Sequence, residues 1–367
     1  MEINGFPSQE GFRMPAEFEP VDQSYMIWPQ RSDNWRNGGK PAQHAFSKLA
    51  EMIAKFQPLT MLVNQSQYQN ARRSLSKKIR VVEMSSNDAW IKDVGPFYIT
   101  NRKEIRGIDF EFNAWGGLVD GLYFPWDKDN QISQKILDLS ETNYYRSGMV
   151  LEGCAVMVDG EGTLITTDDV ILSEGRNKGM TKDHAENIFA HYFGIKKTIW
   201  LKQGYFMDET GGDIDNMINF VRPGEIVLTW TDDINDPQYK ISHEAYETLL
   251  SQTDAAGRKF IIHKIQTPRI IKLTEEEANQ VDMINGMLPR FVGQRLTATY
   301  VNYLTINNII IMPIFDDPED KKAKRLLQNL YPKFEVHTIN AREFLNGGGG
   351  IHTVVSSVPT IIGGGKK

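Results

Sequence analysis

Short β-rich runs alternate with amphipathic helices along almost all of this 367-residue chain, and this repeated order constrains the fold more than any other feature. Each helical stretch places apolar residues three and four positions apart, as a helix with one buried face does. In the stretch 41–56, for example, Phe46, Leu49 and Ile53 follow that spacing behind Pro41, which suits a first helical turn. Because no Ser/Pro/Gly-rich linker interrupts the order, the sequence predicts an α/β fold in a single domain, 1–367.

The remaining elements follow from the same periodicities. Helices are predicted near 41–56, 130–140, 183–194, 241–254 and 318–330. Strands are predicted at 24–28, 59–63, 79–84, 156–166, 198–201, 219–230, 259–265, 297–315 and 334–339. The runs at 156–166 and 219–230 are predicted to be hairpins, which turn at Asp159-Gly160 and at Arg222-Pro223-Gly224. The recurring order of strand pair, helix and strand is consistent with an internal repeat.

Composition excludes several classes of protein. Hydrophobic residues make up 40% of the chain and charged residues 24%, as in ordinary globular proteins, and the formal net charge is -6. The absence of a basic run argues against nucleic-acid binding, and the absence of a long apolar stretch argues against a membrane span. Cys154 is the only cysteine, so no disulfide can form within the chain. With no recognisable signal peptide, we expect a cytoplasmic protein in a reducing compartment.

Four segments gather polar and aromatic residues with glycine outside any helical period: 87–96, 151–163, 208–216 and 346–353. Within the third, Asp213 and Asp215 would point to one face if the backbone were extended. The glycine run at 346–352 lacks the Lys-Ser/Thr ending of a phosphate-binding loop. Its glycines are predicted to let the backbone approach a ligand closely or adopt positive φ, and a flexible turn is the alternative.

Taken together and in this order, the four segments resemble the signature blocks of the agmatine deiminases. Further similarity runs through 11–20, 28–43, 112–127 and 172–177, so that the resemblance covers roughly 5–359 and leaves 360–367 as a tail. It implies a pentein-type five-bladed α/β propeller with pseudo-fivefold repeats. It also implies hydrolysis of agmatine to N-carbamoylputrescine and ammonia, with neither a metal nor an organic cofactor.

A guanidinium group is planar and cationic, so that carboxylates can hold its N–H edges by charge-assisted hydrogen bonds. By the resemblance, Asp93 and Asp215 are the clamping carboxylates, and Glu152 matches the glutamate of the Glu-Gly-Gly block. Trp90 and Trp115 match tryptophans near the ligand. All five substrate-binding positions therefore keep the residue type that the family uses.

The catalytic positions differ from the family pattern. Thr353 stands where the family has its nucleophilic cysteine, and Asp213 stands where it has the proton-shuttling histidine. A threonine hydroxyl is a weak nucleophile without an adjacent base, and an ordinary Asp, with a pKa of about 3.9, is already ionised at neutral pH. Lys92 replaces an arginine of the first block, and the stretch from Cys154 to Met157 lacks a serine and a histidine. We therefore expect an impaired or inactive paralogue, a pseudoenzyme that retains its guanidinium pocket.

Other interpretations stay open. The chain could be a working agmatine deiminase or a related guanidine hydrolase of polyamine metabolism, with Cys154 as a relocated nucleophile rather than a buried inert thiol. His352 could be a catalyst, although a structural hydrogen-bonding role is favoured. The acids of segment 208–216 could bind a hard cation, although a ligand-facing edge is favoured. The expected partners are a small cation, agmatine or a polyamine, and further copies of the chain or an active relative in an oligomer.

Overall fold

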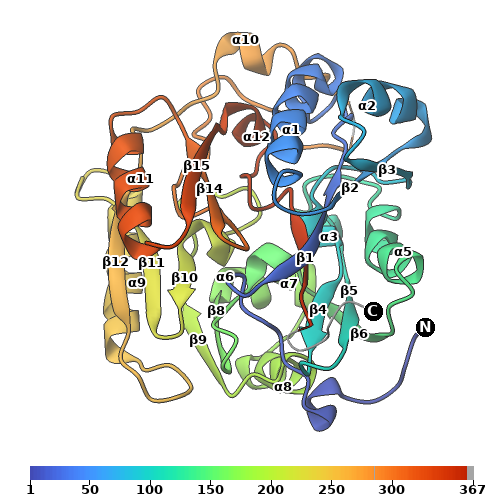
Figure 1. The fold of residues 1–367 in the computed structure, drawn as a ribbon. Coiled ribbons are helices and arrows are strands. Elements are labelled where there is room, and N and C mark those ends of the chain that lie inside the picture. The colour runs from blue at the N-terminus through green and yellow to red at the C-terminus, as the bar shows by residue number, and fades with distance from the viewer. Residues whose placement is uncertain (285, 362–367) are drawn as a thin grey trace.

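A computed structural model describes residues 1–284 and 286–361, which build five separate β-sheets with helices around them (Figure 1). Most of the tail predicted at 360–367 lies outside the described residues. The sheets in strand order are β16 (Ser356–Pro359), β1 (Val21–Ile27), β2 (Leu59–Val63), β3 (Arg80–Glu83); β4 (Phe97–Thr100), β5 (Ile105–Glu111), β6 (Tyr144–Val150); β7 (Met157–Val158), β8 (Thr163–Thr167), β9 (Lys197–Leu201); β10 (Ile218–Arg222), β11 (Glu225–Trp230), β12 (Ile261–Gln266); and β13 (Leu304–Ile306), β14 (Ile309–Ile314), β15 (Glu335–Asn340).

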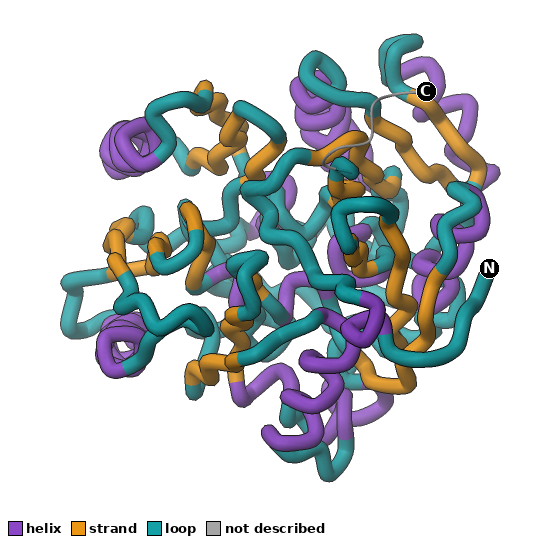
Figure 2. Tube along the Cα trace, turned by 60° about the horizontal axis from the view of Figure 1, so that its bottom comes forward, coloured by secondary structure: helices purple, strands orange, loops and turns teal. Residues whose placement is uncertain are grey.

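One pattern recurs in every sheet: an antiparallel pair is followed by a parallel pair. A parallel pair needs a crossover, and here each crossover carries a helix. These helices are α1 (Lys40–Ile53), α2 (Tyr68–Ser74), α5 (Ile132–Leu139), α8 (Lys182–Phe193), α9 (Pro237–Ser251) and α11 (Glu319–Leu330), and α2 belongs to the second parallel pair of the four-stranded sheet, β2 with β3. Figure 2 shows helices at the outside of the molecule and strands nearer its middle. Within the described ranges no sheet closes on itself, so the five-bladed propeller stays a prediction.

Shorter helices lie elsewhere in the connections between strands: α3 (Ile91–Val94), α4 (Gly117–Asp120), α6 (Asp168–Ile171), α7 (Glu174–Asn177), α10 (Glu275–Ala278) and α12 (Arg342–Asn346). Two single 3-10 turns, η5 (Gly153–Ala155) and η6 (Ile214–Asn216), lie within the polar segments singled out above. The other two polar segments also contain or adjoin short helices: 87–96 contains α3, and 346–353 begins at the last residue of α12. Loops held by rigid sheets commonly carry binding residues, and these four segments fit that rule.

The predicted helices are confirmed at all five places, with boundaries shifted by a few residues. The apolar face of α1 is buried as its spacing predicted, since Phe46, Leu49 and Ile53 are fully inaccessible to solvent. Burying each such side chain contributes about 1.5–3 kcal/mol relative to leaving it exposed. Both hairpin turns are also confirmed, with Gly160 at φ +74° and Gly224 at φ +75°, conformations that favour glycine.

The strand predictions were wrong in two places. The run 297–315 is strand only from Leu304, because Thr299 turns the preceding backbone by accepting a hydrogen bond from the N–H of Val301. The sheet of β4, β5 and β6, and strand β16, were missed altogether. β5 and β6 each contain a glycine, which lowers strand propensity, and Gly107 is there because a Cβ would lie 2.2 Å from Leu137.

Among the described residues, no helix combines the length and apolar character needed to cross a membrane.

Candidate functional site

The polar segments surround a cavity that opens to solvent, with ≈ 420 Å³ of free space when its mouth is included. Its lining includes Trp90, Trp115, Asp208, Asp213, Asp215, Gly347, Gly348, Gly349 and Thr353. Three of the four segments singled out in the sequence therefore meet at one place, together with the loop that carries Trp115. Residues of the remaining segment, 151–163, lie behind this lining and are described below.

Trp90 forms one wall, at the residue directly before α3, and is fixed on several sides. Its indole N–H donates to Asp88 at 3.0 Å, and its ring lies 5.0 Å from that of Trp35. A Cβ on Gly349 would lie 2.5 Å from a ring carbon of Trp90, and Gly348 has φ +106°. The positive φ predicted for the glycine run is therefore present at Gly348, and Gly349 lets the backbone pack closely on the indole of Trp90. A close approach of the backbone to a ligand stays a prediction.

Trp115 forms a second wall, edge-on to Trp90 at a centroid distance of 6.4 Å and an angle of 73°. Its backbone has φ +64°, which is rare for a bulky residue and costs about 1–3 kcal/mol. Such strain is typical of residues whose orientation serves a site. Two aromatic rings beside acidic groups suit a flat cation, which ring faces and carboxylates both attract.

Asp213 and Asp215 line the cavity together, although the backbone between them is not extended. The segment folds into the turn η6 because Asp208 accepts hydrogen bonds from the N–H of Asp213 at 3.0 Å and from Asn216 at 3.2 Å. Asp213 Oδ2 accepts from the Thr210 hydroxyl at 2.7 Å. The other oxygen of Asp213 and Oδ1 of Asp215 are buried without a hydrogen-bond partner among the described residues.

Asp93 and Glu152 lie behind the lining rather than in it. Asp93 accepts from the Trp115 indole at 3.2 Å and from the N–H of Cys154 at 3.0 Å, so both of its oxygens are engaged. Glu152 is fully buried and pairs with Arg176 at 2.7 Å, while its second oxygen finds no partner in the described structure. The predicted clamping role of Asp93 therefore stays a prediction, and the structure gives it a role in holding Trp115.

Three acids in and behind the lining, Asp93, Asp208 and Asp213, hold protons more tightly than ordinary carboxyl groups. Burial is the main cause, and repulsion from neighbouring carboxylates adds to it, while hydrogen bonds to the carboxylates act in the opposite direction. Together they raise the pKa of Asp93 to about 7 and that of Asp208 to about 6. Burial and the charges of Asp93, Asp208 and Glu152 raise the pKa of Asp213 well above its usual value. A bound cation would offset the repulsion among these carboxylates, so the site suits a positively charged ligand.

His352 joins the cavity to a second group of charges. Its Nδ1 hydrogen-bonds Asp215 at 2.9 Å and its Nε2 hydrogen-bonds Glu17 at 2.6 Å. Burial alone would lower the pKa of His352, but Glu17 and Asp215 raise it to about 9, so the ring is an imidazolium at neutral pH. Glu17 also pairs with Lys92, and these three residues line a second cavity of ≈ 740 Å³. The favoured hydrogen-bonding role of His352 agrees with this geometry.

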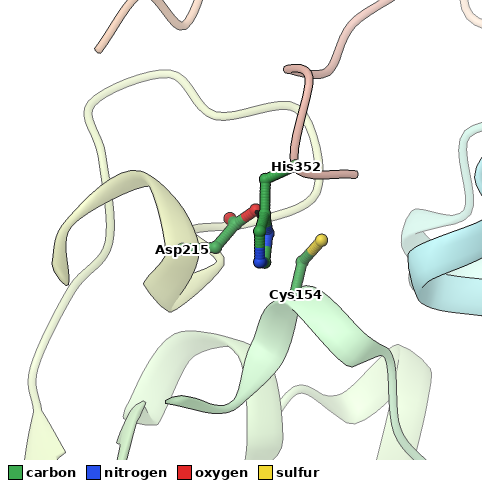
Figure 3. A group of neighbouring side chains, drawn as sticks. All are labelled: Cys154, Asp215 and His352. Carbon is green, nitrogen blue, oxygen red and sulfur yellow. Dashed lines mark hydrogen bonds and ion pairs between the residues drawn. The ribbon is translucent and has the colours of Figure 1, made fainter. Parts of the chain in front are cut away.

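Cys154 lies in the turn η5 beside Asp215 and His352, as Figure 3 shows. One possible ligand atom from each of the three residues lies within 4.8 Å of the other two. Burial and the charges of Asp215, Asp93 and Asp213 raise the pKa of the thiol well above its usual value. Thr353, in contrast, lines the ligand cavity directly.

Comparisons with known proteins decide the family. The model of the Porphyromonas-type peptidyl-arginine deiminases matches residues 13–359. A Listeria monocytogenes protein provisionally named agmatine deiminase 2 is 53% identical over 98% of both chains, and an agmatine deiminase of Pseudomonas syringae is 48% identical over 97% of this chain and 98% of its own. The chain belongs to the agmatine deiminase family. The solved agmatine deiminase of Enterococcus faecalis, 43% identical, superposes with a TM-score of 0.95 over 98% of this chain and 99% of its own.

These comparisons establish the family, but they do not support the loss of activity that the sequence analysis expected. The chain keeps a thiol, an imidazole and a carboxylate close together in Cys154, His352 and Asp215, and this cluster fits a working hydrolase of the family better than an inactive paralogue. The replacement of catalytic groups at Thr353 and Asp213 therefore remains an interpretation of the sequence. The resemblance to the family itself is confirmed.

Several residues of the site were not singled out in the sequence. Glu17 and Arg176 lie in segments 11–20 and 172–177, which carried the supporting similarity, but neither belongs to a polar block. Asn302, which donates to Asp215 at 2.8 Å, lies in a run that appeared to be strand. Asp88 lies in the first block, and its four hydrogen bonds to Asn34, Ala89 and two indoles depend on packing that periodicity does not show.

Proposed function

We propose that this protein binds agmatine or a close guanidine analogue in the tryptophan-walled cavity and hydrolyses its C–N bond. One observation carries the proposal: Asp213 and Asp215 each present a buried carboxylate oxygen without a partner in the described structure, and both residues line the cavity with Trp90 and Trp115. An unpartnered buried carboxylate oxygen costs about 1–3 kcal/mol or more, and guanidinium N–H groups would satisfy it.

The reaction replaces one amino group of the guanidinium by a carbonyl oxygen. A thiolate adds to the central carbon, a C–N bond breaks as ammonia leaves with a proton, and water then releases the carbamoyl group from sulfur. Cys154 is the chain's only thiol, and a guanidinium beside Asp213 and Asp215 would offset the negative charges that raise its pKa. His352 and Asp215 are the neighbouring groups that can move protons.

A second function, binding without turnover, is favoured by Thr353. This threonine lines the cavity at the position where the resemblance expects the nucleophile, whereas Cys154 is not one of the described residues that line it. Under this alternative the protein holds the same cation and leaves it unchanged. The two functions share a ligand and differ in the product.

Incubation of the purified protein with agmatine, followed by a colorimetric measurement of carbamoyl product, separates them. The first function predicts turnover that Cys154→Ser reduces by orders of magnitude, because loss of a nucleophile has cost on the order of 10⁶ in rate elsewhere. The second predicts no product but a rise in melting temperature with agmatine, which Asp215→Asn abolishes. Neither product nor thermal shift would contradict both.

Thr353→Cys is the matched variant for the second function. If Thr353 occupies the nucleophile position and Asp213 the shuttle position, Thr353→Cys alone should stay inactive, while Thr353→Cys with Asp213→His should gain product. The two substitutions should therefore be strongly non-additive. Rapid turnover by the single variant would show that Asp213 does not stand in for a required histidine.

A further inference from the structure

We propose that Cys154, Asp215 and His352 form a binding site for one divalent ion of the zinc type. The three residues come from η5, from η6 and from the segment before β16, so that the fold, and not the local sequence, brings them together. One possible ligand atom of each lies within 4.8 Å of the others, and all three side chains are buried (Figure 3). This site goes beyond the proposed hydrolysis, for which the family resemblance implied no metal.

The donor set suits this class of ion. Thiolate, imidazole and carboxylate are the ligands that zinc takes from proteins, so the ion would displace one proton from Cys154 and one from His352 as it binds, and three protein ligands leave a fourth position open for water. With metal–ligand bonds of about 2.0–2.3 Å, tetrahedral donors lie roughly 3.3–3.7 Å apart. His352 Nδ1 and Asp215 Oδ2 are now 2.9 Å apart, so this contact would open by a few tenths of an ångström, and the thiol would move inward.

A second observation at Asp215 favours a positively charged ligand beside this carboxylate. Asp215 is 1% exposed, and its Oδ1 has no hydrogen-bond partner in the part of the chain that the structure describes. Its Oδ2 already accepts from Asn302 at 2.8 Å. The ion would bind Oδ2, the oxygen beside His352 Nδ1, which has a second lone pair for the hydrogen bond from Asn302, and its positive charge would stabilise the buried carboxylate as a whole.

The groups around the site support it in the way that metal-binding histidines require. Glu17 accepts from His352 Nε2 at 2.6 Å, which orients the ring with Nδ1 toward Asp215. A carboxylate on the distal nitrogen of a liganding histidine is the usual arrangement, because it fixes the ring and raises its basicity. Lys92 holds Glu17 in turn, and the cavity of ≈ 740 Å³ that Glu17, Lys92 and His352 line gives an ion a route to the ring.

The ion and the guanidinium would compete, because both use Asp215. The ion also adds two positive charges a few ångströms from the cavity and converts Cys154 into a liganded thiolate. The metal-loaded protein is therefore expected to bind agmatine more weakly than the metal-free protein. Zinc would act on the proposed function as an inhibitor, not as its cofactor.

Cobalt titration of the full-length protein tests the site, after treatment with a chelator and dialysis. Because Cys154 is the only cysteine, any sulfur-to-cobalt charge-transfer band in the near ultraviolet must come from it. We expect one cobalt per chain, with this band and the intense visible bands of a tetrahedral ion. Cys154→Ser should remove the charge-transfer band and weaken binding, and Glu17→Gln should weaken it by roughly 10- to 100-fold.

His337→Gln is the matched control, because it removes a half-exposed histidine that pairs with exposed Glu335 elsewhere on the protein. It should leave both the cobalt affinity and the spectrum unchanged. Circular dichroism and the melting temperature of each metal-free variant establish that it is folded. Absence of the charge-transfer band at excess cobalt, or equal cobalt affinity in the wild type and in folded Cys154→Ser, would overturn the site.

Discussion

Carboxylates that are shielded from solvent, fully in the cavity and partly at α10, occur in two regions of this molecule with opposite surroundings. In the cavity, Asp213 and Asp215 keep oxygens without partners, and burial raises the pKa of Asp213 well above its usual value. At α10, Glu277 accepts from Arg342 Nε at 2.7 Å, from Asn346 at 3.0 Å and from the backbone N–H of Thr274 at 2.9 Å. Burial opposes ionisation there too, but these partners lower the pKa of Glu277 to about 2.

The comparison distinguishes a carboxylate that fixes a loop in place, Glu277, from carboxylates that a loop places in the cavity, Asp213 and Asp215. Glu277 fixes α12, and α12 leads directly into the glycine run that packs on Trp90. Its charge is fully used within the protein. The cavity acids are left partly unsatisfied, which costs stability unless something outside the chain completes them. The unpartnered oxygens of Asp213 and Asp215 are therefore what the proposed guanidinium site requires.

Arg176 tests this comparison with the largest expected effect. Arg176→Met leaves Glu152 buried and uncompensated, which should lower the free energy of unfolding by about 3–5 kcal/mol, measured by urea denaturation. Lys178→Met, also near α7, removes an exposed pair with Glu174 and should change stability by less than about 0.5 kcal/mol. Equal losses in the two variants would contradict a buried, uncompensated Glu152.

Ligand-linked stability should distinguish the regions next. Agmatine at a hundred times its Kd should raise the free energy of unfolding by about 2.7 kcal/mol, seen as a higher melting temperature. Asp215→Asn should lose this rise, whereas Glu277→Gln should keep it, because its carboxylate faces only the protein. Added salt should weaken the effect as it screens the charges. A rise that survives in Asp215→Asn would place the cation elsewhere.

Glu277 and Asp213 should differ in how neutralising the side chain changes the stability of the ligand-free protein. Glu277→Gln replaces a charge-assisted acceptor that four donor groups surround, and should cost about 1–3 kcal/mol. Asp213→Asn removes one charge from a group of mutually repelling carboxylates, and should leave stability unchanged or raise it slightly. Urea midpoints of both variants measure this, and the comparison fails if Asp213→Asn is the more damaging.

The smallest effect is on acid stability. Because the folded-state pKa of Glu277 is lowered, the stability it contributes is fully present above its unfolded pKa of about 4.3 and is lost as the pH falls toward about 2. The difference in melting temperature between wild type and Glu277→Gln should therefore be constant near neutral pH and shrink between pH 4.3 and 2. A difference that grows in acid would have the opposite sign to this linkage.

By itself, the sequence determined the alternation of strands and helices, since each crossover helix shows its buried face in its own spacing. It also determined the family, because the compact blocks can be compared directly in their order, and Trp90, Trp115, Asp213, Asp215 and Thr353 of those blocks do line the cavity, whereas Asp93 and Glu152 do not. The glycine run at 346–352 indicated close backbone approach correctly. The missed sheet of β4, β5 and β6 shows the limit of this reasoning, because strands with glycine inside them are stabilised by neighbours such as Leu137 and not by their own pattern.

Only the tertiary structure decided which atoms are paired. Asp93, Asp213 and Asp215 look alike in the sequence, yet packing gives both oxygens of Asp93 a partner and leaves Oδ1 of the other two without one among the described residues. It also brought Cys154 and His352, nearly two hundred positions apart, beside Asp215. Hydrogen bonding and burial depend on distances across the fold, and these distances are set by packing among segments that the local sequence of each does not record.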